Sequence, residues 1–236
     1  VAAQAGPNMP APLTAAKSME KSVGLSRDEA LEVEAKFFAR LALTNEADSL
    51  IGLFLNEQAV SKKARDWESA GRKVSRAAVL GAGTMGGGVA YQSATCGVPI
   101  VMKDIAEKGL DIGMREASKL LAGQVNRGRM TPEAMAAVLG SIQPTLDYST
   151  FGNVDFVVEA VVENEGVKKR VLAECEAVLG SDAILASNTS TLDVNKIASF
   201  TQRPQDVVGM HFFSPANVMK LLEVVRGAAT AKDVLA

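Results

Sequence analysis

Residues 73–88 read KVSRAAVLGAGTMGGG, an apolar run that passes directly into closely spaced glycines. The apolar residues 77–80 are followed by Gly81, Gly83 and Gly86 in the spacing G-x-G-x-x-G. This order predicts a buried parallel strand, a tight turn and the start of a helix. The first glycine permits the turn, the second lets backbone approach a pyrophosphate, and the third lets the helix pack closely on the strand. The free N–H groups of the first helical turn would then face the phosphates.

A carboxylate follows the next predicted strand. Residues 98–102, VPIVM, read as a buried strand, and Asp104 stands at its end, 23 residues after Gly81. A carboxylate at this place accepts hydrogen bonds from the ribose hydroxyls of an adenosine and repels a 2′-phosphate. The two features predict a dinucleotide site that prefers NAD to NADP. The alternative is a structural turn with a chance acidic neighbour.

The composition fits a globular protein and argues against several other classes. The 236 residues, 47% of them hydrophobic, suffice for one large domain or for one domain and part of another. A net charge of −2 gives no general attraction for nucleic acid or anionic membrane. We expect no membrane span, no leader segment and no metal site. Cys96 and Cys175 lie far apart in predicted helices, so we expect reduced packing residues in a cytoplasmic protein.

Strand and helix patterns alternate through the rest of the chain. Further strands are predicted at residues 142–146, 154–162, 183–186, 207–210 and 218–225. Helices are predicted at residues 107–127, 165–179 and 194–200. Another helix is predicted to begin at Thr131, which would be its N-cap and is followed by a proline. The alternation predicts an α/β fold with a Rossmann-type, doubly wound, mostly parallel sheet.

Two helices are predicted before the sheet, at residues 26–43 and 45–67, and residues 1–12 have little regular pattern. These helices have no partner of their own, so we expect them to pack on the nucleotide domain or on a missing part of the protein.

Polar residues gather where the predicted strands end. The parallel strands of such a sheet deliver functional groups at their carboxyl ends. Glu163 ends one strand with Lys168 one turn into the next helix, Asn188 and Ser190 end another strand, and His211 ends a third. Each of the first three could instead be a cap or surface residue. Because all of these residues would lie at the same edge of the predicted sheet, a functional role is favoured.

His211 is the only histidine in the chain. A lone histidine is ordinarily structural, but residues 218–225 predict a strand that would return Glu223 beside it. A carboxylate next to an imidazole fixes its tautomer and stabilises the imidazolium. Such a pair suits an alcohol dehydrogenation in which His211 takes the hydroxyl proton and nicotinamide takes the hydride.

The motifs VLGAGTMGGGVAYQSA, VMKDI, VVEAVVEN with VKK, LASNTSTL and GMHFFSPANVMKLLEVVRG together resemble the L-3-hydroxyacyl-CoA dehydrogenase family. The resemblance covers residues 72–227 and is closest to the dehydrogenase portion of multifunctional fatty-acid β-oxidation enzymes. Residues 10–65 resemble the tail and linker of the enoyl-CoA hydratase portion of those enzymes.

The resemblance implies roles for individual residues. The NAD-binding residues would be Gly81, Gly83, Met85, Gly86, Asp104, Val161, Val162, Glu163, Lys168, Asn188 and Ser190. The substrate would contact Ser190 and Ser214, and His211 and Glu223 would be the catalytic pair. Many members have Asn at position 214, which leaves the carbonyl-orienting role of Ser214 open.

The resemblance also implies a domain organisation. Residues 1–71 would be hydratase helices and linker, 72–227 the NAD-binding domain, and 228–236 the stub of a C-terminal dehydrogenase domain. We therefore expect a fragment of an enzyme that oxidises (3S)-3-hydroxyacyl-CoA with NAD, and that binds NAD with little turnover in this form. The parent would also be a hydratase, with a thiolase β subunit as partner.

Two other functions remain open from the residues. One is a dehydrogenase of another small hydroxy acid, which would not be expected to carry the histidine–glutamate pairing. The other is a non-catalytic NAD-binding protein.

Overall fold

Seven strands form one sheet in the order β3-β2-β1-β4-β5-β6-β7, with every neighbouring pair parallel except β6 and β7. The computed structural model describes residues 1, 5–6 and 8–236. The strands are β1 (Ala77–Leu80), β2 (Ile100–Lys103), β3 (Ile142–Thr145), β4 (Phe156–Glu159), β5 (Ile184–Ser187), β6 (Val207–Phe212) and β7 (Leu222–Val225). The chain order reverses direction between β1 and β4, which is where such sheets form a ligand crevice. The doubly wound, mostly parallel sheet is confirmed.

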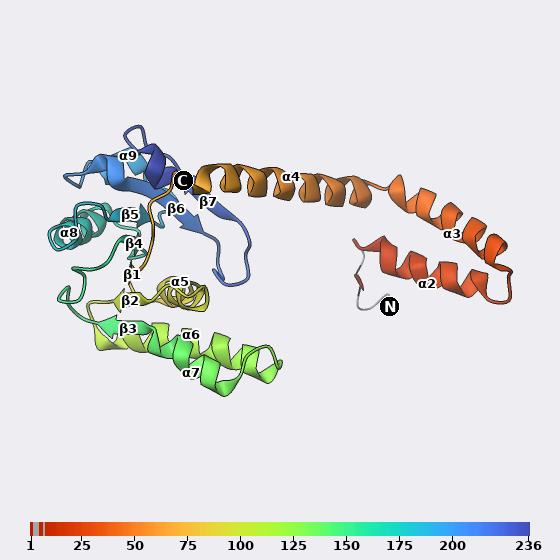
Figure 1. The fold of residues 1–236 in the computed structure, drawn as a ribbon, viewed down its shortest axis with the longest axis horizontal. Coiled ribbons are helices and arrows are strands. Elements are labelled where there is room, and N and C mark those ends of the chain that lie inside the picture. Colours follow the sequence, from red (N-terminus) through yellow and green to blue (C-terminus); the bar gives the residue numbers. More distant parts are fainter. Residues whose placement is uncertain (2–4, 7) are drawn as a thin grey trace. The chain divides into compact units, whose positions relative to one another are not determined.

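Helices cover both faces of the sheet (Figure 1). They are α5 (Thr84–Thr95), α6 (Glu107–Asn126), α7 (Pro132–Gly140), α8 (Glu165–Glu176), α9 (Val194–Ala198) and α10 (Lys232–Leu235), with a 3₁₀ turn, η1 (Pro204–Asp206). One apolar core lies between the sheet and α5, α6, α7 and α10. The other lies between the sheet and α8 and α9. Because both faces are covered, strands β1, β2 and β5 are buried along their whole length.

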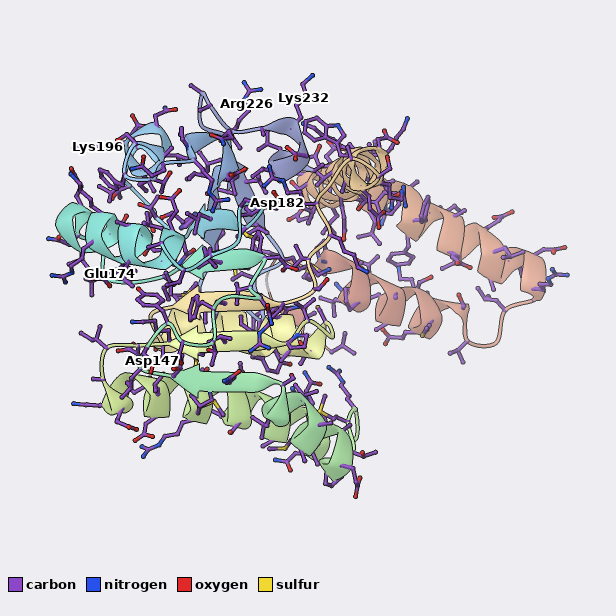
Figure 2. The ribbon with its side chains drawn as sticks, turned by 60° about the vertical axis from the view of Figure 1, so that its left-hand side comes forward. Asp147, Glu174, Asp182, Lys196, Arg226 and Lys232 are labelled. Carbon is purple, nitrogen blue, oxygen red and sulfur yellow. The ribbon has the colours of Figure 1, made fainter. Side chains whose placement is uncertain are left out.

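Most charged side chains lie on the surface, but Lys103, Glu159, Lys168 and Asp206 are buried. The residues labelled in Figure 2 are all exposed: Asp147, Glu174, Asp182, Lys196, Arg226 and Lys232.

The two outer strands of the sheet differ. At β3, the Ile100 N–H donates to Ser141, just before the strand, and the Asp104 N–H donates to Thr145. In this parallel register Pro144 lies on the outward side of the strand. At the other edge, β7 pairs only with β6, and its residues Val224 and Val225 are exposed. The β3 edge therefore lacks a backbone N–H group at Pro144, whereas no proline interrupts the β7 edge.

The chain divides into two units, Val1–Ser69 and Ala70–Ala236. We call them the helical unit and the sheet unit. The helical unit contains α2 (Pro10–Ser22), α3 (Arg27–Ala42) and α4 (Asn45–Glu68). The two predicted helices are present, but the sequence analysis missed α2, which begins at Pro10 without a side-chain cap.

Helix α2 packs against α3, so α3 does have a partner within its own unit. The expectation of an irregular segment over residues 1–12 is wrong from Pro10 onward, and residues 2–4 and 7 lie outside the described residues.

The two cysteines occupy different environments. Both are free, Cys175 is buried in α8, and Cys96 is exposed at the end of α5. The prediction of a packing role is therefore wrong for Cys96, because this residue follows the last residue of α5 and is exposed. Within the described residues no helix is long and apolar enough to cross a membrane.

Candidate active site

The turn between β1 and α5 leaves no room for a side chain at two of its glycines, Gly81 and Gly86. Gly81 has φ +94°, and a Cβ on it would lie 2.6 Å from the carbonyl oxygen of Ala160 on the neighbouring strand connection. A Cβ on Gly86 would overlap the carbonyl oxygen of Gly81. Helix α5 starts after Gly83 without a side-chain cap, so the N–H groups of its first turn are free for a ligand. These are the features of a phosphate-binding helix start.

Asp104 closes the other side of this turn. Its Oδ2 accepts a hydrogen bond from the Ala82 N–H at 2.8 Å, and its Oδ1 accepts from Ile105 and Ala106 at 2.7 and 3.2 Å. Gly109 passes so close that a Cβ there would overlap the carboxylate. The carboxylate is therefore fixed at the carboxyl end of β2, with acceptor capacity left for further donors.

A cavity of about 380 Å³ opens between the glycine turn and the end of β4. Its wall combines the turn, the end of β2 and the connection after β4: Leu80, Gly81, Gly83, Lys103, Asp104, Ile105, Tyr148, Ala160, Val161, Val162, Val167, Arg170 and Val171. A glycine cradle, a fixed carboxylate and an apolar wall suit the phosphates, ribose and base of a dinucleotide.

His211 lies between two polar partners at the carboxyl end of β6. In the antiparallel β6–β7 pair it stands directly opposite Glu223, and its Nδ1 is 2.8 Å from Oε2 of that carboxylate. Its Nε2 is 3.2 Å from the Ser190 hydroxyl oxygen. The hairpin predicted from the sequence is confirmed. Because a carboxylate can only accept, the imidazole proton sits on Nδ1 and the Nε2 lone pair faces Ser190.

Glu163 organises the loop that carries Ser190. Its Oε1 accepts hydrogen bonds from the Thr189 hydroxyl, from the Ser190 N–H at 3.1 Å, and from the N–H and hydroxyl of Thr191 at 3.3 and 3.2 Å. Its Oε2 lies 3.1 Å from the Lys168 ammonium. Partial burial raises the pKa of Glu163, but the hydrogen bonds from Thr189 and Lys168 and the charge of Lys168 outweigh it and lower the pKa to about 2.

Residues 76–236 match the model of the 3-hydroxyacyl-CoA dehydrogenase NAD-binding domain. The chain belongs to the 3-hydroxyacyl-CoA dehydrogenase family. The matched domain is an NAD-binding one, so the cofactor of this dehydrogenase domain is NAD.

Curated proteins of similar sequence support this family assignment. Over all 236 residues the chain is 54% identical to the fatty acid oxidation complex subunit alpha of Pseudomonas savastanoi and 56% identical to that of Pseudomonas entomophila. It spans 33% of the length of these curated relatives.

Solved structures of the family show the same fold. 3-Hydroxybutyryl-CoA dehydrogenase from Escherichia coli is similar at 36% identity and a TM-score of 0.67, over 70% of this chain and 35% of that one. FadB2 from Mycobacterium tuberculosis is similar at 38% identity and a TM-score of 0.66, over 69% of this chain and 57% of that one.

The dehydrogenase domain places the predicted site residues in two groups. Gly81, Gly83, Asp104, Val161 and Val162 line the cavity. His211, Glu223, Ser190 and Glu163 form the polar group described above, and Met85 is half-buried in the first turn of α5. The individual roles of these residues stay predictions.

Three predicted residues have surroundings that the sequence did not indicate. Lys168 is 1% exposed and contacts carboxylates beneath the surface. The Asn188 side-chain oxygen accepts a hydrogen bond from the Phe212 N–H at 2.8 Å, which ties the end of β5 to the end of β6. Ser214 is exposed in the connection from β6 to β7, three residues after His211.

The sequence analysis missed two residues of this candidate site. Glu159, the last residue of β4, is fully buried and binds the Lys168 ammonium with both oxygens at 2.8 and 2.9 Å. Thr189 is buried and donates to Glu163. A glutamate at the end of an apolar strand was the available signal for Glu159.

Proposed function

We propose that this chain carries the NAD site and the acid–base pair of an enzyme that oxidises (3S)-3-hydroxyacyl-CoA to 3-oxoacyl-CoA in fatty acid β-oxidation. The observation that carries the proposal is His211, held between Glu223 and Ser190 at the same edge of the sheet as the glycine turn. The relatives' name, fatty acid oxidation complex subunit alpha, supports the pathway.

His211 acts as the base in this reaction. With its proton on Nδ1 held by Glu223, the imidazole offers the Nε2 lone pair to the substrate hydroxyl. NAD, when bound, accepts the hydride that leaves the hydroxyl-bearing carbon. The O–H proton passes to Nε2 and a carbonyl remains on the substrate, so Glu223 stabilises the imidazolium that forms. Ser190, 3.2 Å from Nε2, contacts the same hydroxyl and orients it.

Asp104 selects the nucleotide. Its fixed carboxylate accepts hydrogen bonds from the ribose hydroxyls and repels a 2′-phosphate, so this domain takes NAD in preference to NADP. The free N–H groups at the start of α5 receive the pyrophosphate. Val161 and Val162 line the cavity and complete the NAD side of the site, while the buried Lys168 acts on that side only through Glu163. Ser214 contacts the substrate.

The parent protein is larger and has further activities. In this proposal residues 1–71 are the tail and linker of an enoyl-CoA hydratase portion, 72–227 the NAD-binding domain and 228–236 the beginning of a C-terminal dehydrogenase domain. Identity to alpha subunits of the fatty acid oxidation complex along the whole chain supports this organisation. The proposal also includes a thiolase β subunit as partner and a cytoplasmic location.

The first test is calorimetric titration of the 236-residue chain with NADH and NADPH. We expect NADH to bind more tightly, and Asp104→Ala to weaken NADH binding about 10- to 100-fold, because a hydrogen bond to a charged group contributes about 1.5–3 kcal/mol. Asp111→Ala, an exposed carboxylate on α6, is the control and should leave the affinity unchanged. A folded chain that binds neither nucleotide would contradict the proposal.

The second test separates an enzyme from an NAD-binding protein without catalysis. Reduction of acetoacetyl-CoA by NADH, which we expect to be slow in the 236-residue chain, is measured for the chain and for His211→Ala. An enzyme loses its rate in the variant and keeps its NADH affinity. A rate that survives the loss of His211 would exclude the proposed base.

A further inference from the structure

A mostly buried ionic network contacts the loop of residues 189–191, which we call the Ser190 loop. Lys168, in the first turn of α8, is 1% exposed and reaches Glu159 on β4 and Glu163 after it. A buried ammonium is costly unless carboxylates compensate its charge. Here two carboxylates share one cation, and they occupy different positions relative to the site.

Glu159 is the inner carboxylate and its hydrogen-bonding capacity is filled. Beyond the two contacts with Lys168, its Oε2 accepts from the Ser187 hydroxyl at 2.6 Å and its Oε1 from the Val161 N–H at 2.9 Å. The side chain is 0% exposed. A carboxylate with four donors and no exposed surface cannot contact a ligand, so any effect of Glu159 on the site passes through its neighbours.

Glu163 is the outer carboxylate and is 38% exposed at its side chain. One oxygen is held by Lys168, and the other receives the donors of residues 189–191. Contacts therefore run without a gap from Glu159 to Lys168, to Glu163, to the Ser190 loop and to Nε2 of His211.

We propose that Glu159 is a positioning residue, which fixes the Lys168 ammonium and through it holds Glu163 against the loop that carries Ser190. The role of Ser190 and His211 in turnover rests on the proposed function, whereas the effect of Glu159 on the loop does not. Lys168 thus fixes Glu163, and Glu163 holds the Ser190 loop through its hydrogen bonds.

The test compares Glu159→Gln with Asp206→Asn in the ¹⁵N-labelled chain. Asp206 is an equally buried carboxylate, 2.8 Å from Arg72, and it precedes β6 at the end away from His211. In both variants a buried carboxylate loses its charge and its ion pair. In Glu159→Gln we expect the Ser190 and Thr191 amide signals to shift and their hydrogen exchange to accelerate at least about tenfold. In Asp206→Asn the two amides should keep their wild-type signals.

A second variant covers the case in which Glu159→Gln does not fold. Glu159→Gln with Lys168→Met removes the buried charges together, which restores folding without restoring the link to Glu163. The Ser190 and Thr191 amides should remain unprotected in this double variant. Wild-type amides in either folded variant would overturn the proposal.

Kinetics separate this inference from the proposed function. If the chain reduces acetoacetyl-CoA with NADH, Glu159→Gln should lower kcat about tenfold with little change in the KM for NADH, and Asp206→Asn should leave both constants unchanged. An unchanged kcat in folded Glu159→Gln would count against the positioning role. A folded wild-type chain that binds neither NADH nor NADPH, but whose amides respond to Glu159→Gln as expected, would refute the proposed function alone.

Discussion

In the helical unit no residue of α2, α3 or α4 is buried, whereas the sheet unit has an apolar core on each face of its sheet. The helices rest on local interactions: Ser26 and Glu29 form a capping box, and Thr44 caps α4. The sheet unit rests on contacts between residues far apart in the chain. Local signals thus suffice to define a helix, but a binding site needs the rigidity of a packed interior.

The largest effect is expected when a methyl group is added to a glycine in each unit. Gly86→Ala should lower the free energy of unfolding by about 3–5 kcal/mol and abolish NADH binding, because the Cβ overlaps the carbonyl oxygen of Gly81. Gly52→Ala in α4 meets open space and should stabilise its helix by about 0.5–1 kcal/mol.

Urea unfolding measures both units separately in one sample. Trp67 in α4 is the only tryptophan of the chain, so its emission reports on the helical unit. Tyr91 and Tyr148, the only tyrosines, report on the sheet unit through near-ultraviolet circular dichroism. Equal effects of the two glycine variants would abolish the distinction between the units.

The next largest effect on stability is expected when a large apolar side chain is truncated in each unit. Leu185→Ala, at a side chain that is 1% exposed in β5, should cost about 2–5 kcal/mol of unfolding free energy. Phe54→Ala, 58% exposed in α4, should change it by less than about 0.5 kcal/mol. The same denaturant titration gives both values, and a large cost at Phe54 would show a hidden core in the helical unit.

A smaller effect on the free energy of unfolding is expected when the pH is lowered. The pKa of Glu163 falls from 4.5 to about 2 in the folded chain, so its stabilising contribution is complete above about pH 4.5 and is lost as the pH falls toward 2. Glu163→Gln should flatten the decline in stability of the sheet unit over this range. Glu29, whose pKa is lowered by its hydrogen bonds with Ser26, is the exposed counterpart, and Glu29→Gln should flatten only the decline of the helical unit.

The smallest effect is expected from removal of the helical unit. Every residue of the cavity and of the His211 group belongs to Ala70–Ala236. Residues 70–236 alone should therefore bind NADH within about twofold of the whole chain in a calorimetric titration. A tenfold loss would place part of the nucleotide site in the first 69 residues.

The sequence predicted most of the sheet unit because its signals are local. The glycine spacing, the apolar runs and the strand after His211 specified the turn, the parallel strands and the opposition of His211 and Glu223. The family resemblance supplied the roles of these residues, which the geometry alone does not assign.

What the sequence did not predict depends on contacts between distant residues. The burial of Lys168 and Glu159 arises only when β4, β5 and α8 assemble. The lysine in a predicted helix gave no sign of it, and the one available signal was a glutamate at the end of an apolar strand. Helix α2 was missed for another reason: no side chain caps its start, whereas Ser26 and Thr44 mark the starts of α3 and α4.

The unequal edges of the sheet have a consequence for aggregation. At β3 the outward-facing Pro144 lacks an N–H, so another chain cannot extend the sheet there without losing a hydrogen bond. At β7 no proline interrupts the edge, and exposed Val224 and Val225 favour strand addition. Intermolecular pairing in concentrated solutions should therefore begin at β7, and a lysine in place of Val225 is the substitution that would blunt it.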